Sequence, residues 1–215
     1  AVAALLQRRA LLYDKSGEEH FNLISALHKS MRNSDPDAAV YWLARMIEAG
    51  EDVMYVARRL IRFASEDVGN ADPQGLVVAT AAAEAFDRVG LPEGRLILSQ
   101  AATYLACAPK SNASAKAIWD ASAAAKEHGA LPVPLHLRNA PTPLMRGLGY
   151  GRGYEYPHDA PDAFVATANL PDEIAEARFY EPGERGAERA IGERLAELRA
   201  RRTRRRRAGR DERDG

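Results

Sequence analysis

The chain has 215 residues, 46% of them apolar, so it is long enough to bury one hydrophobic core and does not have the composition of a disordered protein. Its net charge is zero, but residues 199–210 hold eight arginines and no acid, so the other residues together carry a net charge of −8. The single cysteine, Cys107, excludes an internal disulfide and fits a reducing compartment, and the apolar start of the chain stops at Arg8, too early to span a membrane.

The first predicted helix begins at a capping box, Ser16 followed by Glu19, in which the two side chains satisfy free backbone N–H groups. It is expected to end near Asn33. One face of this helix carries Phe21, Ile24, Leu27, His28 and Met31. Because His28 lies on or beside an apolar face, we interpret it as a core or interface histidine.

The next three predicted helices each begin at an aspartate, which can accept a hydrogen bond from a free N–H group of the first turn. The aspartates are Asp35, Asp52 and Asp72, and the helices occupy 38–49, 52–69 and 74–89. Proline follows two of these aspartates, where the first helical turn tolerates it. The predicted buried positions are Ala39, Leu43, Met46, Ile47, Val56, Leu60, Ile61, Ala64, Leu76, Val77, Thr80, Ala83 and Phe86, with Trp42 beside them.

Two more helices complete the predicted body. Pro92 opens the fifth, which Pro109 closes, and Ser111 or Asn112 opens the sixth, which carries Ile118 and Trp119 and ends at Gly129. Short turns make sequential helices antiparallel neighbours, so the sequence predicts an all-α antiparallel bundle or array. No residue pattern recurs from one helix pair to the next, which disfavours a regular solenoid.

A proline-, glycine- and tyrosine-rich irregular segment follows, at about 130–183. Within it we expect a short helix at 144–148 and strand-like pieces at 164–168 and 178–180. A final helix is predicted over 184–199, with Ile191, Leu195 and Leu198 on one face. Residues 199–215 are expected to form a disordered, arginine-rich tail.

Motifs for catalysis are absent from the sequence. The glycines at 147, 149, 151 and 153 miss the GxGxxG spacing, and GxxxxGK[ST], HExxH and GxSxG do not occur. Glu66 and Asp67 lie at a helix end, where a capping or ion-pair role is more common than acid–base catalysis. Cys107 lies among small residues and is interpreted as a buried small side chain. An enzyme is therefore unsupported by the sequence, though not excluded by it.

Cations near helix ends form the clearest polar pattern. Lys29 and Arg32 close the first predicted helix, and Lys110 lies in the turn before the sixth. Cations at these positions complement the helix dipole, and they could equally contact phosphate groups. The arginines of the tail add sequence-independent attraction to phosphate, and the candidates there are Arg201, Arg202, Arg204 and Arg205.

Four long stretches resemble the C-terminal half of the replication-associated recombination protein A (RarA/MgsA) family of AAA+ ATPases, which is related to Werner-helicase-interacting protein. They are 13–52, beginning YDKSGEEHF, and 57–74, 90–112 and 133–159. The resemblance runs from about residue 1 to 198 and excludes the arginine-rich tail. Asn33 stands where the family usually has glycine and Val53 where proline is common, but asparagine tolerates the left-handed conformation of a helix stop.

The resemblance implies that residues 13–198 form a helical domain similar to the clamp-loader collar, through which bacterial members assemble as tetramers. Residues 1–12 are then the end of the segment from the ATPase lid. The ATPase core, with its ATP and Mg²⁺, would precede residue 1, so this chain is expected to hold no cofactor and to be catalytically silent alone. The resemblance also implies a cytoplasmic, nucleoid-associated protein with no membrane contact. Such a protein is expected to act on DNA at forks, gaps or junctions and to interact with a single-strand-binding protein.

Three functions remain open at this point. The leading hypothesis is an oligomerisation domain, with Trp42, Tyr150, Tyr154 and Tyr156 as candidate packing or interface residues. The alternative is a nucleic-acid-binding module that uses Lys29, Arg32, Lys110 and the tail. The third is a free-standing enzyme.

Overall fold

The computed structural model describes the backbone of residues 18–214 and the side chains of residues 19–205. Every regular element in this range is a helix, and no strand occurs there, so the chain is all-α. The described residues belong to two compact units. The first unit contains residues 18–116 and Pro182–Arg189, and the second contains Ala117–Glu181 and residues 190–214. The predicted Ser16 cap and the predicted linker end at 1–12 lie outside the described residues.

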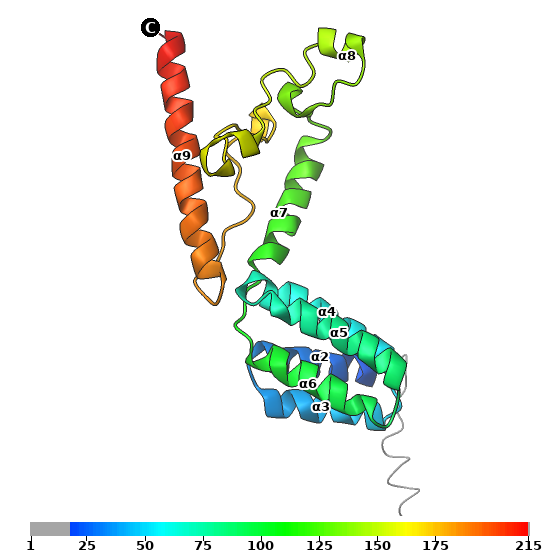
Figure 1. Cartoon of the computed structure of the whole chain (residues 1–215). Helices are drawn as coiled ribbons and strands as arrows, with labels where there is room; N and C mark the ends of the chain where they lie inside the picture. Colours follow the sequence, from blue (N-terminus) through cyan, green and yellow to red (C-terminus); the bar gives the residue numbers. More distant parts are fainter. Residues whose placement is uncertain (1–17, 215) are drawn as a thin grey trace, which may run out of the picture. The chain divides into compact units, whose positions relative to one another are not determined.

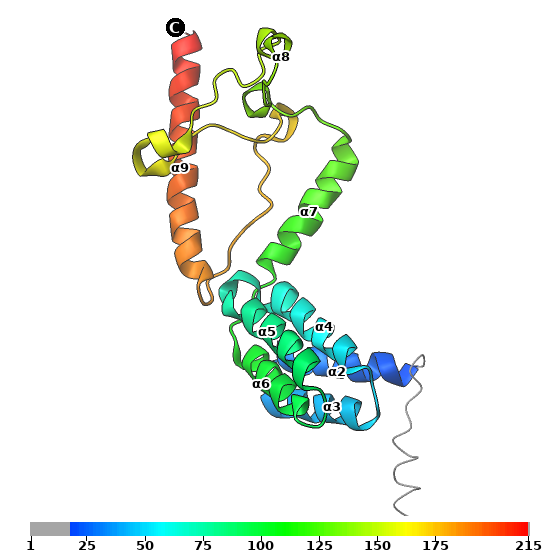
Figure 2. The same cartoon turned by 45° about the vertical axis from the view of Figure 1, so that its right-hand side comes forward.

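The first unit is a bundle of antiparallel helices, which Figures 1 and 2 show side by side. The helices are α2 (Glu18–Arg32), α3 (Pro36–Glu48), α4 (Val53–Phe63), α5 (Gln74–Val89) and α6 (Gly94–Cys107). Two of the three predicted caps are confirmed: Asp35 accepts a hydrogen bond from Ala38 N–H and Asp52 from Met54 N–H. The N-cap of α5 is Pro73 rather than Asp72, although Asp72 accepts a hydrogen bond from Gln74 N–H. The left-handed residue after α2 is Ser34, with φ of 58°, rather than the predicted Asn33.

The core of the first unit is formed by one face of each of these helices. It includes the predicted Leu27, Met31, Leu43, Met46, Val56, Leu60 and Phe86, together with α6 residues Leu98, Ala101, Ala102, Leu105 and Ala106. The predicted inner face of α5 is wrong at three positions, because Leu76, Val77 and Thr80 are exposed. The helix instead buries Gly75, Ala79, Ala82, Ala83 and Phe86. Small residues let α5 approach closely, as at Gly75, where a Cβ would lie 3.1 Å from Val68.

The end of α4 departs from α-helical geometry. Residues Ala64–Val68 form a π-helical turn, η1, which is followed by the 3-10 turn η2, Gly69–Ala71. Asp67 and Val68 are buried in this turn. The wider turn places the Asp67 carboxylate against α2, and π-turns of this kind are frequent at functional sites.

The second unit contains most of α7 (Ala113–His128), the short α8 (Pro143–Gly147), the 3-10 turns η3 (Leu135–Leu137), η4 (Pro157–Asp159), η5 (Pro161–Ala163) and η6 (Asp172–Ile174), and most of α9 (Glu188–Asp214). The strand-like pieces predicted at 164–168 and 178–180 are wrong, since both stretches are irregular. The last helix begins at 188 rather than at 184. Residues 182–187 instead form a loop, in which Gly183 N–H donates to the Glu188 carboxylate and Ala187 N–H donates to Ala71 C=O.

The arginine-rich stretch differs from the expectation of a disordered tail. In the structure α9 does not end at Arg199 but continues to Asp214. Arginine is a strong helix former, so a run of arginines can extend a helix that is already nucleated.

Candidate functional site

The described residues contain no cluster of histidine, cysteine, aspartate and glutamate suited to a metal ion. Among the same residues, no helix combines the length and apolar character needed to cross a bilayer. Cys107, predicted to be buried, is exposed. The features that remain are two hollows in the first unit, the cations at helix ends, and the surface of the second unit.

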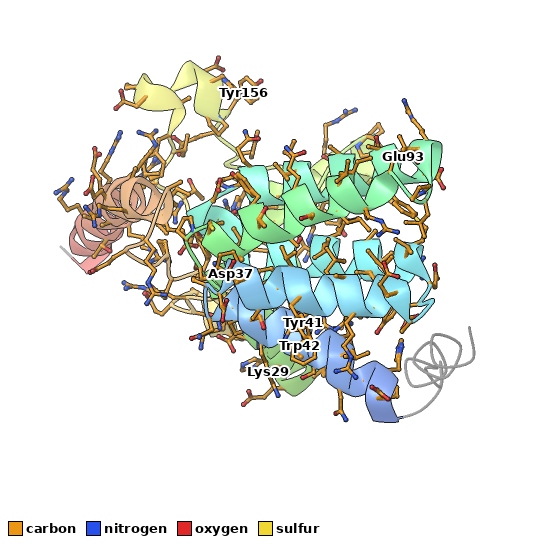
Figure 3. The ribbon with its side chains drawn as sticks, turned by 90° about the horizontal axis from the view of Figure 1, so that it is seen from below. Lys29, Asp37, Tyr41, Trp42, Glu93 and Tyr156 are labelled. Carbon is orange, nitrogen blue, oxygen red and sulfur yellow. The ribbon has the colours of Figure 1, made fainter. Side chains whose placement is uncertain are left out.

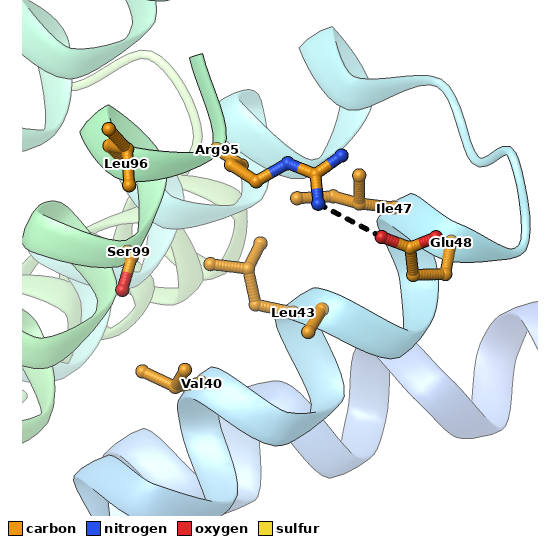
Figure 4. A pocket seen from close by; sticks show the side chains of 8 residues that line it. Val40, Leu43, Ile47, Glu48, Arg95, Leu96 and Ser99 are labelled. Atoms are coloured by element: carbon orange, nitrogen blue, oxygen red, sulfur yellow. Dashed lines mark hydrogen bonds and ion pairs between the residues drawn. The ribbon is translucent and has the colours of Figure 1, made fainter. Parts of the chain in front are cut away.

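An apolar groove of about 190 Å³ lies between α3 and α6 (Figure 4). It is lined by Val40, Leu43, Ala44, Ile47, Glu48, Arg95, Leu96 and Ser99. The only charged side chains in it, Arg95 and Glu48, pair with each other at 3.1 Å. The groove is smaller than the roughly 300–1,000 Å³ of ordinary ligand pockets, and its lining offers no nucleophile with a base. It therefore has no chemistry of a catalytic site.

A second hollow, of about 520 Å³, lies between α2 and α3 at Trp42. Arg45 lies over the Trp42 ring, 5.7 Å from its centroid, and pairs with Glu19 at 2.7 Å. Tyr41 meets the edge of the same ring and is exposed, and Figure 3 shows both aromatic residues on α3. Trp42 is thus half-buried, and its contacts are within the first unit.

Two of the three helix-end cations are engaged by the fold. Arg32 donates two hydrogen bonds to the Asp67 carboxylate, from Nε at 2.5 Å and Nη2 at 3.1 Å, and this pairing raises the Arg32 pKa. Lys110 Nζ donates to the carbonyls of Ala106 and Ala108 at the end of α6, at 2.9 and 2.5 Å. Lys29 is exposed and extends away from the bundle in Figure 3. Arg32 and Lys110 are therefore engaged in contacts within the fold, although the Arg32 side chain is still half exposed, and Lys29 is exposed as well.

His28 lies in the core, in agreement with its sequence interpretation. Its side chain is 7% exposed and meets the edge of Phe63, with ring centroids 5.6 Å apart. Burial is the largest cause of a lowered His28 pKa, and the positive charge of Arg59 acts in the same direction; together with the other nearby charges they lower the pKa from 6.5 to about 4. The imidazole is consequently neutral at physiological pH.

The second unit differs from the first because it has no buried core. No described side chain in residues 117–181 or 190–205 is buried. The unit instead exposes large apolar side chains: Ile118 (62%), Trp119 (54%), Leu144 (73%), Leu148 (59%), Tyr154 (53%) and Tyr156 (55%). A helix such as α7, of 16 residues with none buried, lacks the tertiary packing that usually stabilises helices in water.

The candidate tyrosines divide into two groups. Tyr150 is half-buried under the guanidinium of Arg138, which lies 5.0 Å from the ring centroid. Tyr154 and Tyr156 are exposed, and Figure 3 shows Tyr156 pointing outward. These two tyrosines are therefore not part of a core within this chain, and their packing or interface role stays a prediction.

The arginines of α9 pair with acids of the irregular segment, whose part around η4 and η5 lies beside α9 in Figures 1 and 2. Arg199 pairs with Glu181 and Arg201 with Asp162, each at 3.1 Å, and Arg205 pairs with Glu155. Arg201 and Arg202 also lie over the Phe164 ring, at 4.9 and 5.6 Å from its centroid. Sequence reasoning missed these pairs, although eight acids in residues 155–184 were the signal that could have pointed to them.

Glu188, at the start of α9, is also absent from the sequence predictions. It is fully buried in the first unit and accepts hydrogen bonds from Ser111 Oγ at 2.6 Å and Gly183 N–H at 2.7 Å. Beside it, Ala187 N–H donates to Ala71 C=O at 2.8 Å. These contacts join the loop before α9 to η2 and to the turn before α7.

Comparison with known proteins identifies the family. Residues 33–199 match the family model described as MgsA AAA+ ATPase C terminal, and residues 1–32 match the AAA C-terminal domain model. The chain is 54% identical over 191 residues to replication-associated recombination protein A of Escherichia coli, which covers 88% of this chain and 43% of that protein. It is 52% identical to the protein of that name in Haemophilus influenzae, over 91% of this chain and 44% of that protein.

A eukaryotic protein is also similar. The Dictyostelium discoideum ATPase WRNIP1 is 45% identical over 84% of this chain, which corresponds to 21% of that protein. The chain thus spans less than half the length of these relatives. With its matched region extending over most of its residues, the chain belongs to the MgsA AAA+ ATPase C-terminal family.

Proposed function

We propose that this chain is the oligomerisation domain of a DNA-dependent AAA+ ATPase of replication-associated recombination, and that its subunits meet through the second unit. The observation that carries the proposal is the absence of a buried side chain among the described residues of that unit, together with its exposed apolar residues. Monomeric soluble proteins rarely expose large contiguous apolar patches. A neighbouring subunit is the partner that would bury them.

The free energies of burial and of association favour a contact made by several of these residues. Burying one Ile or Leu side chain stabilises by roughly 1.5–3 kcal/mol, whereas association costs roughly 4–15 kcal/mol in lost freedom. Ile118 and Trp119 on α7, with Leu144 and Leu148 around α8, are the proposed anchors. The resemblance to the family suggests a tetramer, and Trp42 and Tyr150 are proposed to support the fold rather than the contact.

We further propose that the longer protein binds ATP and Mg²⁺ in parts that its relatives possess and this chain does not span. Its DNA substrates would be forks, gaps and junctions, its site of action the bacterial nucleoid, and a single-strand-binding protein one of its partners. On this proposal, nucleotide added to the present chain produces no thermal shift. A saturable shift would favour the alternative of a free-standing enzyme.

Light scattering during size-exclusion chromatography tests the assembly. The wild-type chain is expected to elute with the mass of a multimer, and Ile118→Ser with Trp119→Ser to shift the mass toward the monomer. Leu96→Ser is the matched control, because Leu96 is 70% exposed but lies on α6 of the first unit. Neither change touches a buried side chain, so circular dichroism should show helicity close to wild type.

Two results would contradict the proposal. One is a wild-type chain that remains monomeric from dilute to concentrated solution. The other is an unchanged wild-type mass in two double variants, Ile118→Ser with Trp119→Ser and Leu144→Ser with Leu148→Ser.

A further inference from the structure

The groove between α3 and α6 is lined almost entirely by apolar side chains and is open to solvent. Val40, Ala44 and Ile47 follow one another at intervals of four and three residues along α3, so they lie on one face of that helix. Leu96 lines the groove from α6, and 70% of its surface is exposed. Figure 4 shows these side chains of α3 and α6 around the same hollow. The first unit thus presents an apolar row on the outside of its bundle.

The size and shape of the groove favour a helix over a small molecule as its occupant. The volume of about 190 Å³ is below the roughly 300–1,000 Å³ of ordinary ligand pockets, and the lining has few polar groups to orient a small ligand. Side chains of a helix recur every three or four residues, which matches the spacing of the α3 row. An amphipathic helix laid between α3 and α6 can therefore place apolar side chains against Val40, Ala44 and Ile47 in turn.

The charged residues of the helices that form the groove are acids where they are not already paired. Five charged residues lie on α3, on α6 and in the turn at 90–93, namely Asp37, Arg45, Glu48, Glu93 and Arg95. Arg45 pairs with Glu19 of α2 at 2.7 Å, and Arg95 pairs with Glu48 at 3.1 Å. Asp37 and Glu93 are exposed, and neither has an ion pair with a described residue. The unpaired charge of these elements is therefore negative.

The two unpaired acids lie at opposite ends of the groove. Asp37 is one helical turn before Val40 on α3, and Glu93 precedes α6 at the end where Arg95 pairs with α3. Figure 3 shows Asp37 and Glu93 at opposite sides of the bundle. Lys110 follows the far end of α6, but its ammonium donates to two backbone carbonyls and a hydroxyl of the same unit. Residues 18–116 together hold three more acids than bases, so this unit as a whole is also acidic.

We propose that this groove is the docking site for an amphipathic helix of another protein, with apolar residues on one face and lysines or arginines beside them. The apolar face packs on Val40, Ile47 and Leu96, and the cations approach Asp37 and Glu93. Burial of apolar surface supplies the affinity, whereas the acids at the two ends favour basic helices over acidic ones and speed the encounter. The proposal does not rest on the subunit contact, whose proposed anchors lie on α7 and around α8.

Selection from a peptide display library tests the proposal. The library presents helical peptides of about 16 residues, which form roughly four turns. Peptides are selected for binding to the full 215-residue chain after removal of those that bind the Leu96→Asp variant. The retained peptides are expected to carry apolar residues at intervals of three and four, together with a net positive charge.

Fluorescence anisotropy of a labelled, retained peptide then compares variants of the chain that played no part in the selection. Ala44→Gln places a longer, uncharged side chain in the groove and should weaken binding by roughly tenfold or more. Asp37→Asn with Glu93→Gln should weaken binding by about two- to fivefold at low salt and reduce its salt dependence. Leu76→Asp is the matched control for Leu96→Asp and should bind like wild type, because Leu76 is exposed on α5 and does not line the groove. All of these residues are exposed, so circular dichroism of the variants should match that of wild type.

Four results would overturn the proposal. Three are the absence of peptides that depend on Leu96, retained peptides that are acidic or lack the helical spacing, and retained peptides that bind Ala44→Gln like wild type. The fourth is a lower mass for Leu96→Asp than for wild type in light scattering, because it would assign the groove to a second copy of this chain. The Ile118→Ser with Trp119→Ser variant should bind the peptides like wild type, so failure of this proposal is distinguishable from failure of the assembly proposal.

Discussion

At the scale of single residues, His28 shows how the fold sets a protonation state. It is packed against Phe63, and the charged groups around it are Arg59, Asp67, Arg32 and Arg62. Desolvation is the main cause of its low pKa, and the arginines outweigh the one acid. The sequence could identify His28 as a core residue from its helical face, but its pKa depends on α4 and η1, which lie over it only in the folded chain.

The lowered pKa of His28 predicts a stability loss in mild acid. Above pH 6.5 the imidazole is neutral in both folded and unfolded chains. As the pH falls from 6.5 towards 4, the unfolded chain binds a proton that the folded chain does not bind, so folding becomes less favourable. At pH 5 the loss should be about 2 kcal/mol, because one pKa unit corresponds to about 1.4 kcal/mol.

Urea unfolding at pH 7 and pH 5 measures this effect. In His28→Leu the difference in unfolding free energy between the two pH values should shrink by about that amount relative to wild type. His128→Gln is the control, because His128 is exposed at the end of α7 and should leave the pH dependence unchanged. An unaltered pH dependence in His28→Leu would show that His28 is protonated equally in both states.

At the scale of elements, helix boundaries followed from the sequence better than helix faces did. Asp35 and Asp52 cap α3 and α4 as predicted because capping is a local interaction between residues two or three apart. The inner face of α5 was wrong because apolar size was used to choose it, whereas its core face is made of glycine and alanine. Close helix contact, which depends on the neighbouring α6 and η1, decided between the two faces.

Two glycines of similar backbone conformation, one of them in the loop before α9, should differ in how much stability is lost when each is replaced by alanine. Gly186 has φ of 54°, and a Cβ there would lie 2.0 Å from Ala71 C=O. Gly129 has φ of 67°, but a Cβ there would meet nothing within 4 Å. Gly186→Ala should therefore cost more stability than Gly129→Ala, for which only the backbone strain of roughly 1 kcal/mol is expected.

Unfolding by urea, monitored by circular dichroism, compares the two variants. Gly186→Ala should lose about 2 kcal/mol or more, because the added methyl displaces Ala187 from Ala71 and disturbs the buried Glu188. Equal losses in the two variants would mean that the loop does not dock closely on Ala71.

At the scale of the whole molecule, the family boundary does not coincide with a structural one. The AAA C-terminal domain match ends at residue 32, yet α2, which it includes, supplies Leu23, Ile24, Leu27 and Met31 to the core of the first unit. Arg32 and Asp67, on the two sides of the boundary, are joined by paired hydrogen bonds. The first matched region therefore shares the core of the first unit with residues 33–116 of the second matched region.

The candidate sites illustrate what a sequence leaves undetermined. The split between an acidic body and a basic tail was visible in the composition, but the pairing of Arg201 with Asp162 and of Arg205 with Glu155 was not. These partners lie 39 and 50 residues apart, and an irregular segment has no periodicity from which its path can be predicted. The exposure of Ile118 and Trp119 could not be predicted either, because the sequence pattern of an apolar helix face is the same whether that face packs on a core or on a partner.

The most direct test of the account is amide hydrogen exchange of this chain, followed by mass spectrometry, in dilute and in concentrated solution. If subunits meet through the second unit, amides of α7 and α8 should exchange more slowly at high concentration, while those of α3, α4 and α6 in the buried bundle should be unchanged. Exchange of α7 and α8 that is equally fast at both concentrations, in a chain that light scattering shows to be assembled, would place the subunit contact elsewhere and contradict the central claim.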